Sequence, residues 1–318
     1  MKEPQVKGNF VGIDVSKDKL DIYMRPGGES WTHANGDFKG LCSRLRELKP
    51  ELIVLEPTGG YELGVFNALV DGGFRVSREH AYKIHHHARG SGQLAKTDRV
   101  DASMIAHYAQ CYSEEIEPKE RASRDQELLS QLVSRRKQLI KMQVAEKNRM
   151  EKKGFCRSVI VSCRKIVEVL SREIEKIDEQ IKEVIENKEQ WKEKQRIMRT
   201  VEGIGAKVTW ALIGKLPELG RINHKEIAAL VGVAPFQNQS GKVRKQQSIR
   251  GGRSEVRAAL YMAVLSATRH NPTIRNFYER LLERGKKKKV AQTACAHKLL
   301  RMLNAMVAKG KSYNPSLA

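Results

Sequence analysis

The sequence predicts an α/β domain at the N-terminus, then a helical connector and a mainly α-helical C-terminal domain. Three observations support this organisation. Short apolar segments typical of β-strands are confined to residues 9–76, helical spacing dominates the remainder, and the charge balance changes along the chain. We therefore place the domains at residues 1–118, 119–195 and 196–318.

The chain length and cysteine pattern limit the class of protein. At 318 residues the chain is long enough for two domains and a connector. No segment reaches the roughly 18 apolar residues of a membrane span, and the N-terminus lacks the apolar core of a signal peptide, so we expect a cytoplasmic protein without membrane contact. The five cysteines include no C-x-x-C pair, which favours free thiols over a zinc site or a disulfide framework.

Basic residues are concentrated towards the C-terminus. Residues 1–118 contain 15 Lys and Arg and 17 Asp and Glu. Residues 119–195 contain 20 basic and 14 acidic residues, and residues 196–318 contain 24 basic and 6 acidic residues. So basic a segment is typical of proteins that bind a polyanion, with nucleic acid the leading candidate. A basic surface that serves only solubility is the alternative.

The first three predicted strands form an antiparallel meander. Residues 9–15 are an apolar run that contains Asp14, residues 19–24 alternate between polar and apolar, and a Gly-Gly turn precedes residues 30–34.

Helices and strands then alternate. Residues 38–49 have helical spacing, the apolar run 52–55 delivers Glu56 at its end, residues 61–71 form a helix, and residues 74–76 form a further strand. The order β-β-β-α-β-α-β is that of ribonuclease H and RuvC nucleases, a likeness at the level of the fold.

A late helix is predicted to begin near Asp98. Asp98 and Asp101 lie three residues apart, so they share one helix face; alternatively, Asp98 caps the helix and Asp101 faces water. Together with Asp14 and Glu56 they supply four carboxylates, whose oxygen atoms suit Mg²⁺. Two such ions, held about 3.5–4 Å apart, can promote phosphodiester cleavage. The sequence therefore predicts a two-metal site.

Three consecutive histidines, at residues 85–87, precede this helix. Because consecutive side chains point apart, three in a row do not readily bind one ion. We interpret them as a loop that contacts phosphate or RNA, or as a loop without a function.

The connector carries two predicted helices. The first covers residues 121–153, and the second has apolar residues spaced 3-4-3-4-3-4-3 from Ile160 to Val184. This heptad seam predicts a coiled coil, either between chains, which would make the protein a dimer, or folded back on the first helix.

The basic segment contains a glycine turn and a polar loop. The turn at residues 203–205, with Lys207 after it, resembles the phosphate-binding hairpin of helix-hairpin-helix modules, although a plain helix turn is the alternative. Ser240 lies in the polar loop. The candidate nucleic-acid contacts of the segment are Gly203, Gly205, Lys207, Lys242, Arg244, Lys245, Arg250 and Arg253.

Several motifs together resemble a known family. Residues 12–17 (GIDVSK), 55–61 (LEPTGGY) and 96–102 (KTDRVDA) are similar to the three acidic motifs of the DEDD transposases of bacterial insertion sequences, the bridge-RNA-guided recombinases with a RuvC-like domain. The run from residue 201 to residue 263, which contains GVAP, SG and GGR, resembles the transposase domain of that family. The motifs occur in the matching order.

This resemblance implies a mechanism and partners. Asp14, Glu56, Asp98 and Asp101 would bind Mg²⁺, and Ser240 would attack DNA and hold the broken strand as a phosphoserine. A structured noncoding guide RNA would pair with donor and target DNA while the protein binds backbones. If the carboxylates and Ser240 lie in different domains, the active site is composite, and Ser240 reaches the metals either within one chain or across two chains of a homo-oligomer, a dimer or larger.

Two other functions are compatible with parts of the pattern. A hydrolytic RuvC-type junction resolvase would need the four carboxylates but not Ser240. A nonenzymatic nucleic-acid-binding scaffold would need only the basic domain and the coiled coil, and it leaves the carboxylates unexplained.

Overall fold

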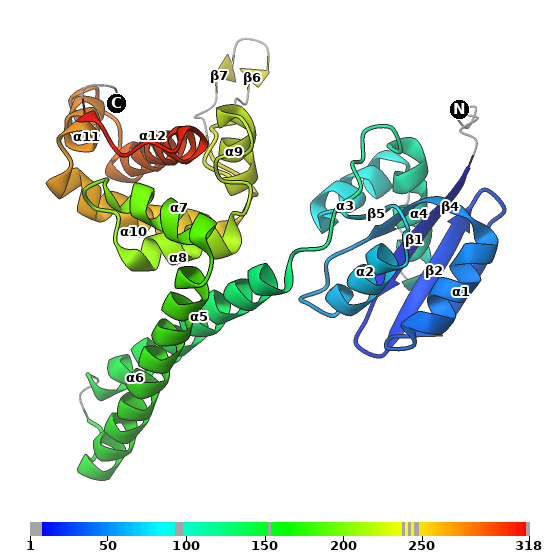
Figure 1. Ribbon diagram of the computed structural model, residues 1–318, viewed down its shortest axis with the longest axis horizontal. Coiled ribbons are helices and arrows are strands. Elements are labelled where there is room, and N and C mark those ends of the chain that lie inside the picture. The colour runs from blue at the N-terminus through cyan, green and yellow to red at the C-terminus, as the bar shows by residue number, and fades with distance from the viewer. Residues whose placement is uncertain are drawn as a thin grey trace. The chain divides into compact units, whose positions relative to one another are not determined.

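The computed structural model describes residues 8–92, 98–151, 154–236, 239–240, 243–244 and 248–315. The chain divides into two compact units, Met1–Ala122 and Ser123–Ala318 (Figure 1). Among the described helices, none combines the length and the apolarity that crossing a bilayer requires.

A five-stranded mixed sheet forms the centre of the first unit. β1 (Asn9–Val15), β2 (Lys19–Arg25) and β3 (Ser30–Ala34) form the antiparallel meander. β4 (Pro50–Leu55) and β5 (Val76–Arg78) follow in parallel with β1, in the order β3-β2-β1-β4-β5. The predicted α/β arrangement is confirmed, with β5 two residues further along the chain than predicted.

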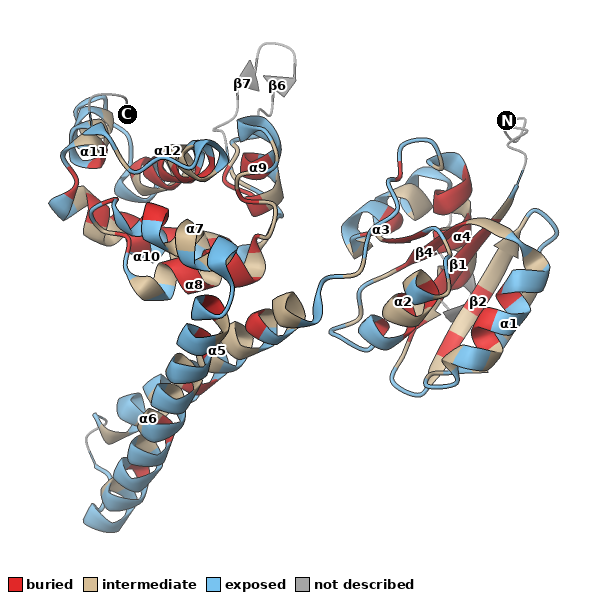
Figure 2. Ribbon diagram, viewed as in Figure 1, coloured by how far each residue is buried: buried red, intermediate tan, exposed pale blue. Residues whose placement is uncertain are grey.

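Helices cover both faces of this sheet. α1 (Phe38–Leu48) and α2 (Glu62–Asp71) share a buried cluster with Val11 and Ile13 of β1. α3 (Ala81–Gly90) and α4 (Asp98–Cys111) share a second cluster with Phe10. Because neighbouring residues of a strand point to opposite faces, the even-numbered residues of β1 face α4. The middle of the sheet is accordingly buried (Figure 2).

The three consecutive histidines lie on α3, so the predicted loop is wrong here. His80 caps the helix by accepting a hydrogen bond from the backbone N–H of Tyr82, and Ile84 is its one buried residue. One apolar anchor leaves no helical periodicity in the sequence. Packing of Ile84 against residues of the sheet and of α4 therefore determines the helix, not its own sequence pattern.

The second unit is helical apart from a short hairpin. Its core joins residues such as Trp210, Leu260 and Leu299 from several helices. The elements are α5 (Arg124–Met150), α6 (Arg157–Glu186), α7 (Glu189–Arg199), α8 (Ala206–Lys215), α9 (His224–Val231), β6 (Gln239–Ser240), β7 (Val243–Arg244), α10 (Ser254–His270), α11 (Pro272–Glu283) and α12 (Lys288–Lys309).

The long helices α5 and α6 pack against each other as a hairpin (Figure 1). Every residue of the predicted seam is buried or half-buried, with Cys163, Leu170 and Ile181 the most buried. The seam therefore packs within the chain. Ile166 and Val169 stay exposed, at 44% and 51%.

Candidate active site

The structure places Asp14 and Glu56 at one edge of the sheet. β1 and β4 are parallel neighbours, with Gly12 opposite Val54 and Ile13 opposite Leu55. Continuing this register by one residue brings Asp14 beside Glu56. Both residues are half-buried and lie on the face that α4 covers. The carboxyl ends of parallel strands are the usual place for a ligand site in α/β folds.

A glycine brings α4 close to this edge. A Cβ atom on Gly12 would lie 2.4 Å from the carbonyl oxygen of Ala102 and 2.3 Å from the backbone nitrogen of Ala106. Further along α4, Tyr108 packs in the cluster of Phe10. α4 therefore runs antiparallel to β1, and its first turn points towards Asp14.

That first turn carries the other two predicted carboxylates. Asp98 is the first residue of α4, and its side chain lies outside the described part of the chain; Asp101 is half-buried one turn later. Both belong to the positive end of the helix dipole, which favours negative charge. The fold thus brings the backbone of all four predicted acidic positions to one region.

Two further carboxylates stand in the same row, and the sequence analysis missed both. Asp21 is the cross-strand partner of Asp14 and accepts a hydrogen bond of 2.8 Å from Thr32 Oγ1. Glu79 directly follows β5, and its backbone N–H donates to the carbonyl of Leu55, one residue before Glu56. No local sequence motif marks these two residues, and only the pairing register of the neighbouring strands identifies them.

Lysines neutralise Glu79. Its carboxylate accepts hydrogen bonds from Lys83 Nζ at 2.7 Å and from Ser77 Oγ at 2.9 Å, and Lys119 Nζ lies 3.8 Å away. Burial by itself raises the pKa of Glu79, but the Lys83 hydrogen bond and the Lys119 charge outweigh it, so the pKa is lowered. Glu79 is thus held as an anion at the rim of the acidic row.

The loop after Glu56 is fixed by a buried glutamate. Glu62 Oε2 accepts hydrogen bonds from the backbone N–H groups of Thr58 at 3.1 Å and Gly60 at 2.8 Å. The Thr58 hydroxyl is buried and has no hydrogen-bond partner among the described residues. A buried hydroxyl without a partner is a polar group that a bound ligand could satisfy.

Ser240 belongs to the second unit, on the β6–β7 hairpin. It pairs with Val243, and its side chain lies outside the described residues, as do Lys242 and Lys245 and the side chain of Arg244. The base of the hairpin is fixed by a 2.9 Å hydrogen bond from the Phe236 N–H to the Ser248 carbonyl.

Arg257 of α10 ties the two sides of this hairpin together. Its guanidinium donates to the carbonyls of Val231 at 3.1 Å and Gly251 at 2.6 Å. Gly232 and Gly252 approach so closely that a Cβ on Gly252 would lie 2.3 Å from the Gly232 nitrogen, and both have positive φ. The GVAP and GGR motifs thus form the support of the serine hairpin.

Other predicted nucleic-acid contacts have partners within the protein. Arg253 donates two hydrogen bonds to Glu218, at 2.5 and 2.6 Å, and Lys207 pairs with Asp178 and lies 4.4 Å from the centre of the Trp210 ring. Gly203 has a φ of +95° and faces the backbone of Ala267 in α10. Gly205 caps α8, and Arg250 is exposed. These geometries give Gly203, Lys207 and Arg253 structural partners.

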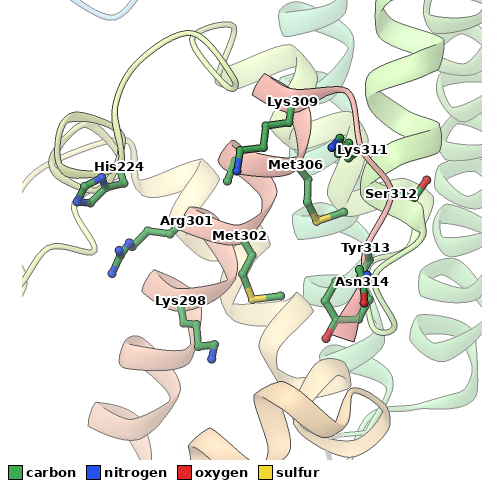
Figure 3. A pocket seen from close by; sticks show the side chains of 11 residues that line it. His224, Lys298, Arg301, Met302, Met306, Lys309, Lys311, Ser312, Tyr313 and Asn314 are labelled. Carbon is green, nitrogen blue, oxygen red and sulfur yellow. The ribbon is translucent and has the colours of Figure 1, made fainter. Parts of the chain in front are cut away.

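A basic groove of about 590 Å³ runs along α12. Met302 and Met306 line it together with the cations Lys298, Arg301 and Lys309 (Figure 3). His224, at the start of α9, also lines it, as do Ala305 and residues 311–314. Apolar methionines between cations can contact sugar and base surfaces while the cations contact phosphates.

Comparisons with known proteins give two family matches along the chain. Residues 11–153 match a family model described as "Transposase", and residues 195–279 match one described as "Transposase IS116/IS110/IS902 family". The chain is 27% identical over 321 aligned positions to the pilin gene-inverting protein of Moraxella bovis, covering 96% of this chain and 97% of the relative. The pilin gene-inverting protein of Moraxella lacunata matches to the same extent.

Proposed function

We propose that this chain, a DNA recombinase that carries two domains of the IS110-family transposases, cleaves and rejoins DNA with the carboxylates of its first unit and Ser240 of its second. One observation carries the proposal. The register of β1 with β4 and the contact of Gly12 with α4 direct Asp14, Glu56 and the first turn of α4 to one edge of the sheet.

The acidic edge has donors that suit Mg²⁺. Asp14, Glu56, Asp98 and Asp101 offer only carboxylate oxygens, the ligands that a hard divalent cation prefers. Two residues after Glu56, the buried Thr58 hydroxyl has no hydrogen-bond partner among the described residues. Bound Mg²⁺ would stabilise charge on the scissile phosphate and activate the attacking oxygen. The four residues would hold the metal, while Glu62 keeps the adjacent loop in place.

Ser240 is the proposed nucleophile. Its Oγ atom forms a bond to the DNA phosphorus, the bond from phosphorus to one DNA oxygen breaks, and the departing strand end takes up a proton as a hydroxyl. The other strand end stays attached to the serine as a phosphodiester. Attack by the hydroxyl of a second strand reverses the step and joins the new pair of ends.

Donor DNA, target DNA and a structured guide RNA are the proposed partners. The second unit carries 42 Lys and Arg against 19 Asp and Glu, a net charge of +23. This charge and the groove along α12 favour contact with nucleic-acid backbones rather than base recognition. Pairing with a guide RNA would then supply sequence specificity. Exposed Ile166 and Val169 on α6 favour a homo-oligomer.

The test is strand cleavage of labelled donor and target DNA with Mg²⁺ and RNA from the flanking noncoding region. Wild type should give DNA covalently attached to protein on a denaturing gel, and Ser240→Ala should give none. Asp14→Asn should also abolish cleavage, while DNA binding measured by anisotropy stays within about twofold because neither residue supplies the binding charge.

The controls separate the alternatives. Ser130, which hydrogen-bonds Lys215 in the same unit, serves as a matched control, so Ser130→Ala should still form the adduct. Cleavage by Ser240→Ala without any adduct would identify a hydrolytic nuclease. Cleavage by neither wild type nor variants, with binding intact, would identify a scaffold.

A further inference from the structure

Two histidines and a cysteine from separate helices meet in the first unit. His87 lies in the last turn of α3, and its Nε2 atom is 3.1 Å from Nδ1 of His107 in α4. One ligand atom from each of His87, His107 and Cys111 lies within 4.8 Å of the other two. Among the described residues, no other trio of His, Cys, Asp or Glu has ligand atoms grouped in this way.

The local structure explains why the three side chains converge. His107 and Cys111 are four residues apart, so they occupy one face of α4. The rings of Tyr108 and Tyr112 lie edge-on to His87, with centroids 5.6 and 5.5 Å away. These aromatic contacts restrict the orientation of the His87 ring.

We propose that His87, His107 and Cys111 bind one Zn²⁺ ion, with water in the fourth position. Imidazole nitrogens and a thiolate are the ligands this cation prefers, and the 3.1 Å between the two histidine nitrogens is close to the roughly 3.3 Å that a tetrahedral zinc site requires. Binding replaces the contact between the two rings by two nitrogen–metal bonds and releases the thiol proton of Cys111.

This site is separate from the acidic edge and chemically different from it. Cys111 ends α4, whereas Asp101 lies near its beginning, about 15 Å away along the helix axis at 1.5 Å per residue. The donors here are nitrogen and sulfur, and the donors there are oxygen. Each site thus selects its own metal, and Zn²⁺ can be studied without Mg²⁺ or DNA.

The role that follows is a clamp between α3 and α4. The sequence connecting the two helices begins after Gly90 and ends before Asp98. A metal bound by His87 of α3 and by His107 and Cys111 of α4 would hold together the two helices that this segment connects. Because α4 carries Asp98 and Asp101, the clamp would hold the helix that presents the predicted catalytic carboxylates.

The experiment uses full-length, tag-free, reduced protein, because a histidine tag itself binds zinc. After EDTA treatment and reloading with Zn²⁺, elemental analysis should find about one ion per chain. Titration with Co²⁺ should produce a thiolate-to-metal charge-transfer absorption band. Cys111→Ser should abolish that band, and Cys111→Ser and His87→Gln should each weaken zinc binding roughly tenfold or more.

Matched variants test the specificity of the assignment. His85→Gln, on an exposed histidine of the same helix, and Cys156→Ser, on an exposed cysteine, should leave zinc binding unchanged. Zinc binding in Cys111→Ser with the affinity of wild type, or an equal loss of zinc affinity in Cys111→Ser and Cys156→Ser, would overturn the proposal. If a ligand variant does not fold, the wild-type Co²⁺ titration decides alone, because absence of the thiolate band overturns it.

Discussion

At the scale of single residues, Gly12 determines whether α4 can reach the sheet. A Cβ atom at this position would lie 2.3 Å from the Ala106 nitrogen and 2.8 Å from the Ile105 carbonyl carbon. Both neighbours are helix backbone, so no flexible side chain can move aside. The distance between Asp14 and the first turn of α4 therefore depends on this glycine.

Gly12→Ala should lower the free energy of unfolding by about 1–3 kcal/mol, since one extra methyl group forces packed backbone apart. Strand-cleavage activity should fall by more than the loss of folded protein explains, because α4 carries Asp101. Gly90→Ala is the control: a Cβ atom added to Gly90 would have no neighbour within 4 Å, and its φ is not positive. Equal unfolding free energies of Gly12→Ala and wild type, measured in urea, would contradict the close approach of α4 to β1.

Glu79 provides a second residue-scale prediction, on pH. Its pKa is lowered in the folded state, so its contribution to stability is complete above the unfolded pKa of about 4.3 and disappears as pH falls through the lower folded value. Glu79→Gln should therefore lower the free energy of unfolding by about 1–3 kcal/mol at neutral pH. This loss should shrink as pH falls below about 4.

Denaturation of wild type and Glu79→Gln across this pH range measures the difference. Glu47→Gln is the control, because Glu47 is exposed on α1 of the same unit. A cost for Glu79→Gln that is independent of pH would show that Lys83 and Lys119 do not stabilise the ionised carboxylate.

At the scale of elements, the serine hairpin depends on α10 for its position. β6 and β7 are two residues each, too short to be stable alone. Arg257, Gly232 and Gly252 attach the hairpin to the ends of α9 and α10. The position of Ser240 is thus set from outside its own loop.

Arg257→Ala should loosen this attachment, because the carbonyls of Val231 and Gly251 lose their charged donor. Hydrogen exchange at the Phe236 amide should become faster, and covalent DNA attachment should fall, with a loss in unfolding free energy of about 1–3 kcal/mol. Arg269→Ala, on an exposed arginine of the same helix, should change neither. Unaltered exchange in Arg257→Ala would assign the anchoring to other residues.

At the scale of the whole molecule, charge is divided unequally between the two units. The first unit carries 17 Lys and Arg against 18 Asp and Glu, and the second carries 42 against 19. Acidic residues gather where a cation is expected, and basic residues gather where phosphates are expected. Affinity for DNA should therefore fall steeply with salt, because bound phosphates release counterions.

Replacing Lys298, Arg301 and Lys309 together by Ala should reduce the slope of log affinity against log salt by about one for each phosphate that the protein no longer neutralises. Anisotropy of a labelled duplex with the full chain measures this slope. Lys176 and Lys192, which pair with Glu173 and Glu189 on the surface, provide the control pair. An unchanged slope in the triple variant would exclude the α12 groove as a DNA-binding surface.

The sequence alone predicted the order of the strands along the chain, most helices and the four candidate acidic residues, since each leaves a local signal. Period-two alternation identified β2, and residues 160–184 carry a seven-residue seam. Tertiary structure alone decided that α3 is a helix, that Asp21 and Glu79 join the acidic row, and that His87 meets His107 and Cys111. These depend on strand register and on packing between elements distant in the chain, which no local pattern encodes.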